Sequence, residues 1–274
     1  MMKDLKRKLE DPFEVESLAP LGFEFLMAAA IGPHNQLFHH NQKQYLANSK
    51  ELTKESQQDL RFPAFKAIPL SAEPVEFDDS LSAALFNRHS TRNFGKESTS
   101  FEQLSFILKL AAGKKNKKEM NRFYPSGGGL YTVRLYVLVR NVRGLEPGIY
   151  LFNPERNVLG LINDPISPED LNKLHNYSQS EGQSHNFEFL LTTRPSVALK
   201  KYTEHGWKII LMEMGHLAQN LWLVSVGCGQ VLYPCTNLNL AYSEKVLRTK
   251  ARGELLLYSL VGGSSGLVSK QGIV

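Results

Sequence analysis

A lysine and a tyrosine stand next to each other at residues 201 and 202, in the stretch LKKYTEHGWK. A tyrosine has a reference pKa of about 10, and a nearby ammonium group lowers that pKa by favouring the phenolate. Tyr202 could therefore act as a general acid or base, with Lys201 as its partner. Both side chains can reach one site only from a helical or irregular turn, because adjacent residues on a strand point to opposite faces. The alternative is a surface lysine beside a half-buried tyrosine.

A second candidate group is RHSTR, residues 88–92, which places two arginines and a hydroxyl close together. The planar guanidinium groups of Arg88 and Arg92 suit phosphate oxygens, and the hydroxyl of Ser90 can donate to the same group. A solvated polar turn would have the same composition. Taken alone, the motif indicates an anion site without deciding between these two interpretations.

Three consecutive glycines, Gly127–Gly129, follow Pro125 and Ser126 and precede the strand-like run LYTVRLYVLV. A glycine-rich loop beside a strand usually lets the backbone approach something closely. The loop is neither a P-loop nor a dinucleotide-binding fingerprint, because the residues that define those motifs are missing around it. It is either a tight turn or a segment of backbone packed against a flat ligand.

The composition excludes several classes of protein. Of the 274 residues, 42% are hydrophobic and 22% are charged, which is typical of a soluble globular protein. The net charge of +5 suits anionic ligands, but no nucleic-acid-binding signature accompanies it. Cys228 and Cys235 match no zinc pattern, so we expect reduced thiols and no metal. The apolar run FLMAAAIG is too short to cross a bilayer, so we expect a cytoplasmic protein without membrane contact.

The pattern of elements favours an α+β fold. Ser100 and Gly113 mark the ends of a helix, and residues 208–226 predict a long, buried central helix in which Glu213 needs a partner. Strands are expected at 135–140, 149–152 and 157–162, in FEFLLTTR and in ELLLYSLVGG. Helices and strands do not alternate regularly, which indicates a sheet flanked by helices. We expect an N-terminal helical and extended segment at 1–75 and the main domain at 76–274.

Several motifs occur together in one order: RHSTRNF, FYPSGGGLYTVRLYVLV, PGIYLFNPERNVLGLI, KKYTEHGWKIILMEMGHLAQNLWLVSVGCG and LLYSLVGG. In this combination, over roughly residues 35–265, the chain resembles the SagB-type dehydrogenases of the nitroreductase-like flavoprotein superfamily. That family includes the dehydrogenase subunit of microcin B synthesis. The resemblance implies a nitroreductase-like fold with a central, mostly antiparallel sheet. It also implies a homodimer with FMN at the subunit interface.

The resemblance also implies cofactor contacts. Arg88, His89 and Ser90 would hold the FMN phosphate and ribityl chain, and Arg92 would approach the N1/O2 edge of the ring. The remaining implied contacts are Pro125, Ser126, Gly127, Gly128, Tyr233, Pro234, Gly262 and Gly263. The chain departs from the family at two places, because HGWK stands where the family has RGYR and VLYPCTNLN replaces a glycine-rich loop.

The activity that the resemblance implies is FMN-dependent oxidation of thiazoline and oxazoline rings to thiazoles and oxazoles in ribosomally made peptides. A cyclodehydratase forms those rings first, so its subunits and an azoline-containing precursor peptide are the expected partners. Lys201 and Tyr202 match the family's catalytic pair. We assign Tyr202 as the base and Lys201 as its partner, and the reverse order stays open because the two titrate together. The alternatives are an NAD(P)H-dependent nitroreductase acting on small molecules and a non-catalytic scaffold subunit.

Overall fold

The structure is a computed structural model. It describes residues 36–47, 66–116, 121–163, 173–175 and 185–266, together with residues 21, 25 and 167. Most of the N-terminal segment expected at residues 1–75 lies outside these residues. Within them, α4 (Gln36–Ala47) packs against α9 (Pro195–Tyr202), the helix that carries Lys201 and Tyr202.

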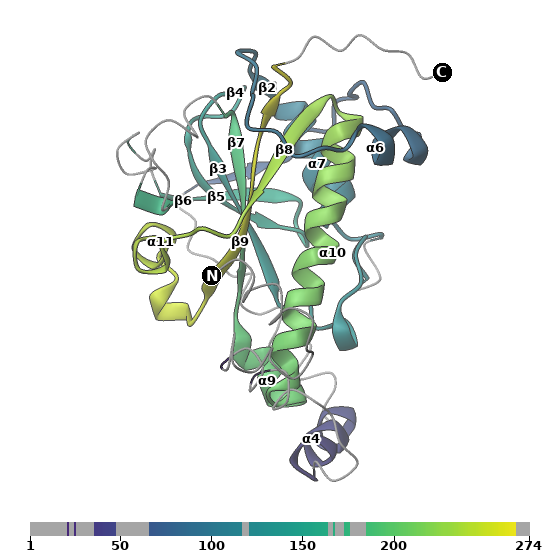
Figure 1. Ribbon diagram of the computed structural model, residues 1–274, viewed down its shortest axis with the longest axis vertical. Coiled ribbons are helices and arrows are strands. Elements are labelled where there is room, and N and C mark those ends of the chain that lie inside the picture. Colours follow the sequence, from purple (N-terminus) through teal and green to yellow (C-terminus); the bar gives the residue numbers. More distant parts are fainter. Residues whose placement is uncertain are drawn as a thin grey trace, which may run out of the picture.

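A seven-stranded sheet forms the centre of the molecule (Figure 1). Its strand order is β1-β6-β5-β3-β7-β9-β8, and each neighbouring pair is antiparallel. The strands are β1 (Ala67–Pro69), β3 (Val133–Val139), β5 (Gly148–Asn153), β6 (Val158–Asn163), β7 (Phe187–Thr193), β8 (Gln230–Cys235) and β9 (Leu255–Ser264). Short strands β2 (Thr99–Ser100) and β4 (Val142–Arg143) pair separately.

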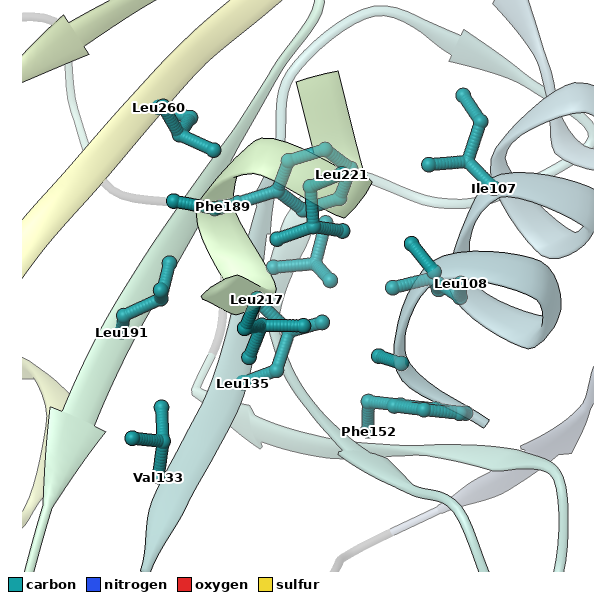
Figure 2. Close-up of a cluster of buried hydrophobic side chains, with 14 of the residues drawn as sticks. Ile107, Leu108, Val133, Leu135, Phe152, Phe189, Leu191, Leu217, Leu221 and Leu260 are labelled. Atoms are coloured by element: carbon teal, nitrogen blue, oxygen red, sulfur yellow. The ribbon is translucent and has the colours of Figure 1, made fainter. Parts of the chain in front are cut away.

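Helices cover both faces of this sheet. The long helix α10 (His205–Gly227) and α7 (Phe101–Ala112) lie on one face, where Leu217 and Leu221 pack against Leu135 and Phe189 (Figure 2). Helix α11 (Leu240–Leu247) covers the other face in a second apolar cluster. Every residue of β3 and β7 is buried, since both of their faces are covered. The expected α+β architecture with a mostly antiparallel sheet is confirmed.

Helix α7 forms as its sequence predicts. The Ser100 side chain accepts a hydrogen bond from the Gln103 backbone N–H, and the Gln103 side chain accepts one from the Ser100 N–H. This capping box satisfies two backbone donors at the start of the helix. Gly113 follows the last helical residue. The predicted boundaries at 100 and 113 are therefore confirmed.

Helix α10 is longer and less buried than its composition predicts. It extends from His205 to Gly227, and its inner side buries Ile210, Met214 and Leu221. Its outer side leaves Leu211 51% exposed and Met212 54% exposed. The expected long central helix is present, and its buried side is the one that faces the sheet. By length and hydropathy the helix could cross a membrane, but half of its most apolar window is buried, as in a core helix.

Two further segments differ from expectation or add to it. The stretch VLYPC, which stands where the family has a glycine-rich loop, belongs to β8, an edge strand of the sheet. Strand β1 lies within the expected N-terminal segment, residues 1–75, yet it pairs with β6 in the central sheet. The strands expected at 135–140, 149–152 and 157–162 are present as β3, β5 and β6, with ends shifted by one or two residues.

Candidate active site

Lys201 and Tyr202 are the last two residues of α9. The helix starts with Pro195, which suits the first position, and ends at Thr203, whose φ of 50° leaves the helical region. The helical turn brings both side chains to one place, as their adjacency requires. The Lys201 Nζ lies 4.6 Å from the centroid of the Tyr202 ring.

Burial changes the acidity of Lys201. Only 5% of the Lys201 surface is exposed. Loss of solvent disfavours the ammonium and lowers the pKa of Lys201 to about 8. A lysine with this pKa exchanges its proton close to neutral pH, as acid–base catalysis requires.

The glycine loop packs directly against the pair. Gly127–Gly129 form a single 3-10 turn in which Gly128 has φ 63° and Gly129 has φ 66°. A Cβ atom at Gly128 would overlap the Lys201 Nζ and the Tyr202 Oη. One at Gly127 would overlap the Ile209 side chain of α10. The nearest described neighbours of Gly128 are thus the two candidate catalytic side chains.

Glu213 of α10 accepts hydrogen bonds from residues on both sides of the glycine loop. Its carboxylate accepts hydrogen bonds from the Ser126 hydroxyl at 2.6 Å and the Val133 N–H at 2.9 Å. The Ser126 Oγ in turn accepts a hydrogen bond from the Tyr131 N–H at 2.8 Å. Burial raises the pKa of Glu213, while these hydrogen bonds oppose the rise. Glu213 therefore fixes both ends of the glycine loop, a role that its sequence position did not specify.

Removing this carboxylate is expected to destabilise the protein. Glu213→Ala leaves the Ser126 hydroxyl and the Val133 N–H without their buried acceptor, so we expect a loss of about 2–4 kcal/mol. Glu213→Gln keeps an acceptor oxygen and should lose no more than about half of that. Denaturant unfolding measures both changes. Equal destabilisation by glutamine and alanine would show that Glu213 does not act through these hydrogen bonds.

The RHSTR segment lies along the edge strand β8. Ser90 forms a bridge with Leu232, and the Thr91 N–H donates to the Leu232 carbonyl. Arg92 donates a hydrogen bond to the Tyr233 hydroxyl, and its guanidinium lies 3.9 Å from the centroid of that ring. The fold therefore brings RHSTR together with the expected contact residue Tyr233. Pro234, the next residue of β8, is half-buried.

The chemistry of this segment fits a phosphate group. The Arg88 guanidinium lies 4.7 Å from the centroid of the Trp222 ring, and neither it nor Arg92 has a carboxylate partner among the described residues. His89 and Ser90 are exposed beside them. Two guanidinium groups, an imidazole and a hydroxyl without a neighbouring anion form a donor set for phosphate oxygens. The residues present fit the phosphate of FMN.

The fold groups the expected site residues into two sets. Lys201 and Tyr202 lie with the glycine loop near the start of α10, and RHSTR lies with Tyr233 near its end. Gly262 and Gly263 are one strand further into the sheet, in β9. A Cβ at Gly262 would meet Leu232 at 2.5 Å and the Phe187 ring at 2.5 Å. Packing within the sheet therefore accounts for the glycine at position 262.

A comparison with known protein families gives the class of this protein. The chain belongs to the nitroreductase family, whose sequence model matches residues 85–263. Proteins of this family depend on FMN. The protein is therefore a nitroreductase-family flavin oxidoreductase.

Individual relatives agree with this family. A Methanocaldococcus jannaschii protein assigned to the nitroreductases is 29% identical over 157 residues, which are 57% of this chain and 76% of that protein. A Ralstonia eutropha nitroreductase structure matches with a TM-score of 0.63 and 20% identity, over 76% of this chain and 93% of that one. An Anabaena variabilis nitroreductase structure also matches with a TM-score of 0.63 and 20% identity. That match covers 73% of this chain but only 42% of the Anabaena chain.

One solved structure belongs to a larger assembly. A chain of the Escherichia coli microcin synthetase McbBCD complex, with truncated pro-MccB17 bound, matches with a TM-score of 0.58 and 21% identity. The match covers 86% of this chain and 97% of that chain. At this identity the likeness shows the shared fold.

Proposed function

We propose that this protein is an FMN-dependent azoline dehydrogenase that oxidises thiazoline or oxazoline rings of a ribosomally made peptide to thiazoles or oxazoles. The observation that carries the proposal is the contact of Gly128 with Lys201 and Tyr202. This contact supports the proposal, because the proposed acid–base pair then lies against the loop that would lie beside the flavin. A general base is what this reaction needs, because an azoline becomes aromatic only when a carbon-bound proton leaves.

The proposed roles divide the reaction between cofactor and protein. FMN, when bound, supplies the acceptor for the hydride that leaves the ring carbon, and oxygen is the proposed final acceptor. Lys201 and Tyr202 remove the proton from the alpha carbon. Burial lowers the pKa of Lys201 to about 8, so roughly half of the amine is neutral at that pH. The neutral amine can take this proton directly or accept one from Tyr202.

The proposed cofactor contacts are those with matching chemistry. Arg88, His89 and Ser90 would hold the phosphate and ribityl chain, and Arg92 with Tyr233 would lie at the ring. Ser126, Gly127 and Gly128 would present backbone to the flavin, with Pro125 and Pro234 at the margins. For Gly262 and Gly263 the proposed role is indirect, because they support β8 from within the sheet.

The proposed partners follow from the proposed function. The microcin synthetase chain that shares this fold is part of a complex with a bound precursor. We therefore propose cyclodehydratase subunits and an azoline-containing peptide as partners of this protein in the cytoplasm. A second copy of the chain is the proposed occupant of the exposed outer side of α10, where Leu211 and Met212 are uncovered.

Turnover of a defined peptide tests this function. The FMN-loaded protein is incubated in air with a synthetic thiazoline peptide, and the product is weighed by mass spectrometry. We expect loss of two hydrogen atoms per ring without added NAD(P)H. The same peptide without the ring is the control and should keep its mass. If the thiazoline peptide keeps its mass after prolonged incubation with the enzyme, the proposal is wrong.

A small-molecule nitroreductase is the second candidate. It is favoured by the 29% identical Methanocaldococcus jannaschii relative, which is assigned to the nitroreductases. This function would use NAD(P)H as the reductant and a nitroaromatic compound as the acceptor. NADPH consumption that depends on a nitroaromatic compound, with no change in thiazoline peptide, would favour it over the peptide dehydrogenase.

The rate of peptide oxidation is expected to rise with pH through about 8. The pKa of Lys201 is lowered from 10.5 to about 8, so below this pH the pair holds a proton that it must lose before acting as a base. The rate constant kcat/KM should therefore increase about tenfold per pH unit between about pH 6 and pH 7.5, and level off above about pH 8.5. A flat profile, or one that falls across this range, would contradict the assignment.

Loss of either RHSTR guanidinium is expected to weaken FMN binding. Arg88→Ala removes a charge-assisted contact to phosphate worth about 1.5–3 kcal/mol, so the Kd for FMN should rise about 10- to 100-fold. Riboflavin lacks the phosphate, and its Kd should change little in the same variant. The exposed Arg143→Ala is the matched control. Equal losses for FMN and riboflavin would show that Arg88 does not bind the phosphate. Flavin fluorescence titration measures all of these values.

A further inference from the structure

Cys235 of β8, Glu188 of β7 and His175, which lies outside the strands, form a chain of contacts away from the site described above. The Cys235 Sγ of β8 lies 3.7 Å from the His175 Nδ1, and the His175 Nε2 lies 3.0 Å from the Glu188 carboxylate of β7. Glu188 alternates with Phe189, whose side chain packs toward α10. Its own side chain therefore points to the face covered by α11.

The three side chains are almost fully buried. Their exposed fractions are 4% for Cys235, 6% for His175 and 0% for Glu188. Burial alone lowers the pKa of His175, but the charge of Glu188 and the contacts with Cys235 and Glu188 outweigh it and raise the pKa to about 10. The carboxylate is held ionised, because His175 and its hydrogen bond lower the pKa of Glu188 against the effect of burial.

Other titratable groups face this line of residues. His185 lies beside Glu188 and helps to lower the pKa of that carboxyl. An Arg140 guanidinium nitrogen lies 3.2 Å from the His185 Nδ1. Burial lowers the pKa of Arg140, and the charge of Glu188 opposes that change. Tyr258 faces Cys235, and burial together with the charge of Cys235 raises the pKa of its phenol. Among these groups, His175 is the one whose imidazole nitrogen contacts the Cys235 sulfur.

We propose that Cys235, His175 and Glu188 form a peroxide-reactive thiol site, in which Cys235 is the atom that is modified. A sulfur nucleophile next to an imidazole that a carboxylate orients is the arrangement that activates cysteines in general. Hydrogen peroxide is the proposed reagent, because it is little larger than water and the thiol is almost fully buried. The site stands on its own geometry, although the proposed oxygen-dependent reaction of this protein would produce peroxide nearby.

The reaction balances without a further reagent. The Cys235 thiolate attacks one oxygen of hydrogen peroxide, a sulfur–oxygen bond forms, and the oxygen–oxygen bond breaks. The leaving hydroxide takes the proton from the His175 imidazolium and departs as water. Sulfur loses two electrons and peroxide gains them, which leaves a sulfenic acid at Cys235 and a neutral imidazole. Cys235 shares β8 with Tyr233, the partner of Arg92, so this change reaches the candidate cofactor site through one strand.

The chain contains a matched control, because its two cysteines are both buried. Burial raises the pKa of the Cys228 thiol to about 12, and no histidine is recorded beside it within the described residues. Cys228→Ser leaves Cys235 as the sole thiol, and Cys235→Ser leaves Cys228. The two variants therefore compare the same chemistry with and without the imidazole.

The experiment exposes each folded variant to hydrogen peroxide at pH 6, removes the peroxide with catalase, and unfolds the protein in a 1,3-dione that traps sulfenic acid. We expect the Cys228→Ser protein to gain the trapped adduct at least about tenfold faster than the Cys235→Ser protein. Equal rates, or faster labelling of Cys228, would overturn the proposal.

A spectroscopic measurement tests whether the His175 imidazole stabilises the Cys235 thiolate. In the Cys228→Ser protein, thiolate absorbance in the ultraviolet should persist below about pH 6, and the added substitution His175→Gln should abolish it. Glu188→Gln should weaken it as well, because the imidazole loses the carboxylate that orients it. If His175→Gln does not fold, the pH titration of the Cys228→Ser protein alone still decides. A thiolate signal that appears only above about pH 8.5 would contradict the proposed pair.

Discussion

Lys201→Ala is expected to reduce oxidation of a thiazoline peptide by about 100- to 10,000-fold, the range found when a general acid or base is removed. The amine is buried and lies against Gly128 and the Tyr202 ring, where the proposed reaction needs it. Tyr202→Phe keeps the ring and removes only the hydroxyl, and it should cause a loss in the same range. Steady-state turnover followed by mass spectrometry measures both.

The adjacent lysine provides the control for this experiment. Lys200 belongs to the same last turn of α9 but is exposed, whereas Lys201 is buried. Lys200→Ala should keep turnover within about twofold of the parent protein, since exposed substitutions seldom change stability by more than about 0.5 kcal/mol. All three variants should still bind FMN. Full activity in both Lys201→Ala and Tyr202→Phe would remove the pair from the mechanism.

Gly128→Ala is expected to reduce turnover about 100-fold. A methyl group at this position overlaps both the Lys201 Nζ and the Tyr202 Oη, and a displacement of about 1 Å of a catalytic group can cost this much. The structure indicates that the added methyl group displaces the side chains of Lys201 and Tyr202. Turnover should therefore fall even in protein that has been saturated with FMN.

Gly129 separates this effect from backbone strain. Gly128 and Gly129 have nearly equal positive φ angles of 63° and 66°, so alanine is strained to a similar degree at either position. A Cβ at Gly129 meets nothing within 4 Å. Gly129→Ala should therefore lose stability, as Gly128→Ala does, but keep most of its turnover. Parallel activity losses in both variants would point to backbone strain rather than displacement of the pair.

The sequence predicted those parts of the structure that depend on local pattern or on shared motifs. The α7 boundaries follow from Ser100 and Gly113, and the strands follow from short apolar runs. The adjacency of Lys201 and Tyr202 required a helical turn, and the structure has one. The fold class was anticipated through the resemblance, which the family match at residues 85–263 now supports.

Contacts between distant segments could not be predicted in this way. Glu213 lies 80 residues from Val133 in the sequence, yet their hydrogen bond fixes the glycine loop. The pairing of Arg92 with Tyr233 depends on β8 forming the edge of the sheet, and no strand was expected at VLYPC. The uncovered side of α10 was missed because an apolar sequence does not show which of its faces meets the rest of the fold.

Anaerobic mixing with an azoline peptide tests the central claim most directly. The FMN-loaded protein is combined with a synthetic thiazoline peptide in the absence of oxygen and NAD(P)H, and the flavin absorbance is followed. The account predicts that the absorbance is lost, with one thiazole formed for each flavin bleached, and that Lys201→Ala slows this loss about 100-fold or more. A flavin that keeps its absorbance with the peptide but loses it rapidly with NADPH would contradict the account.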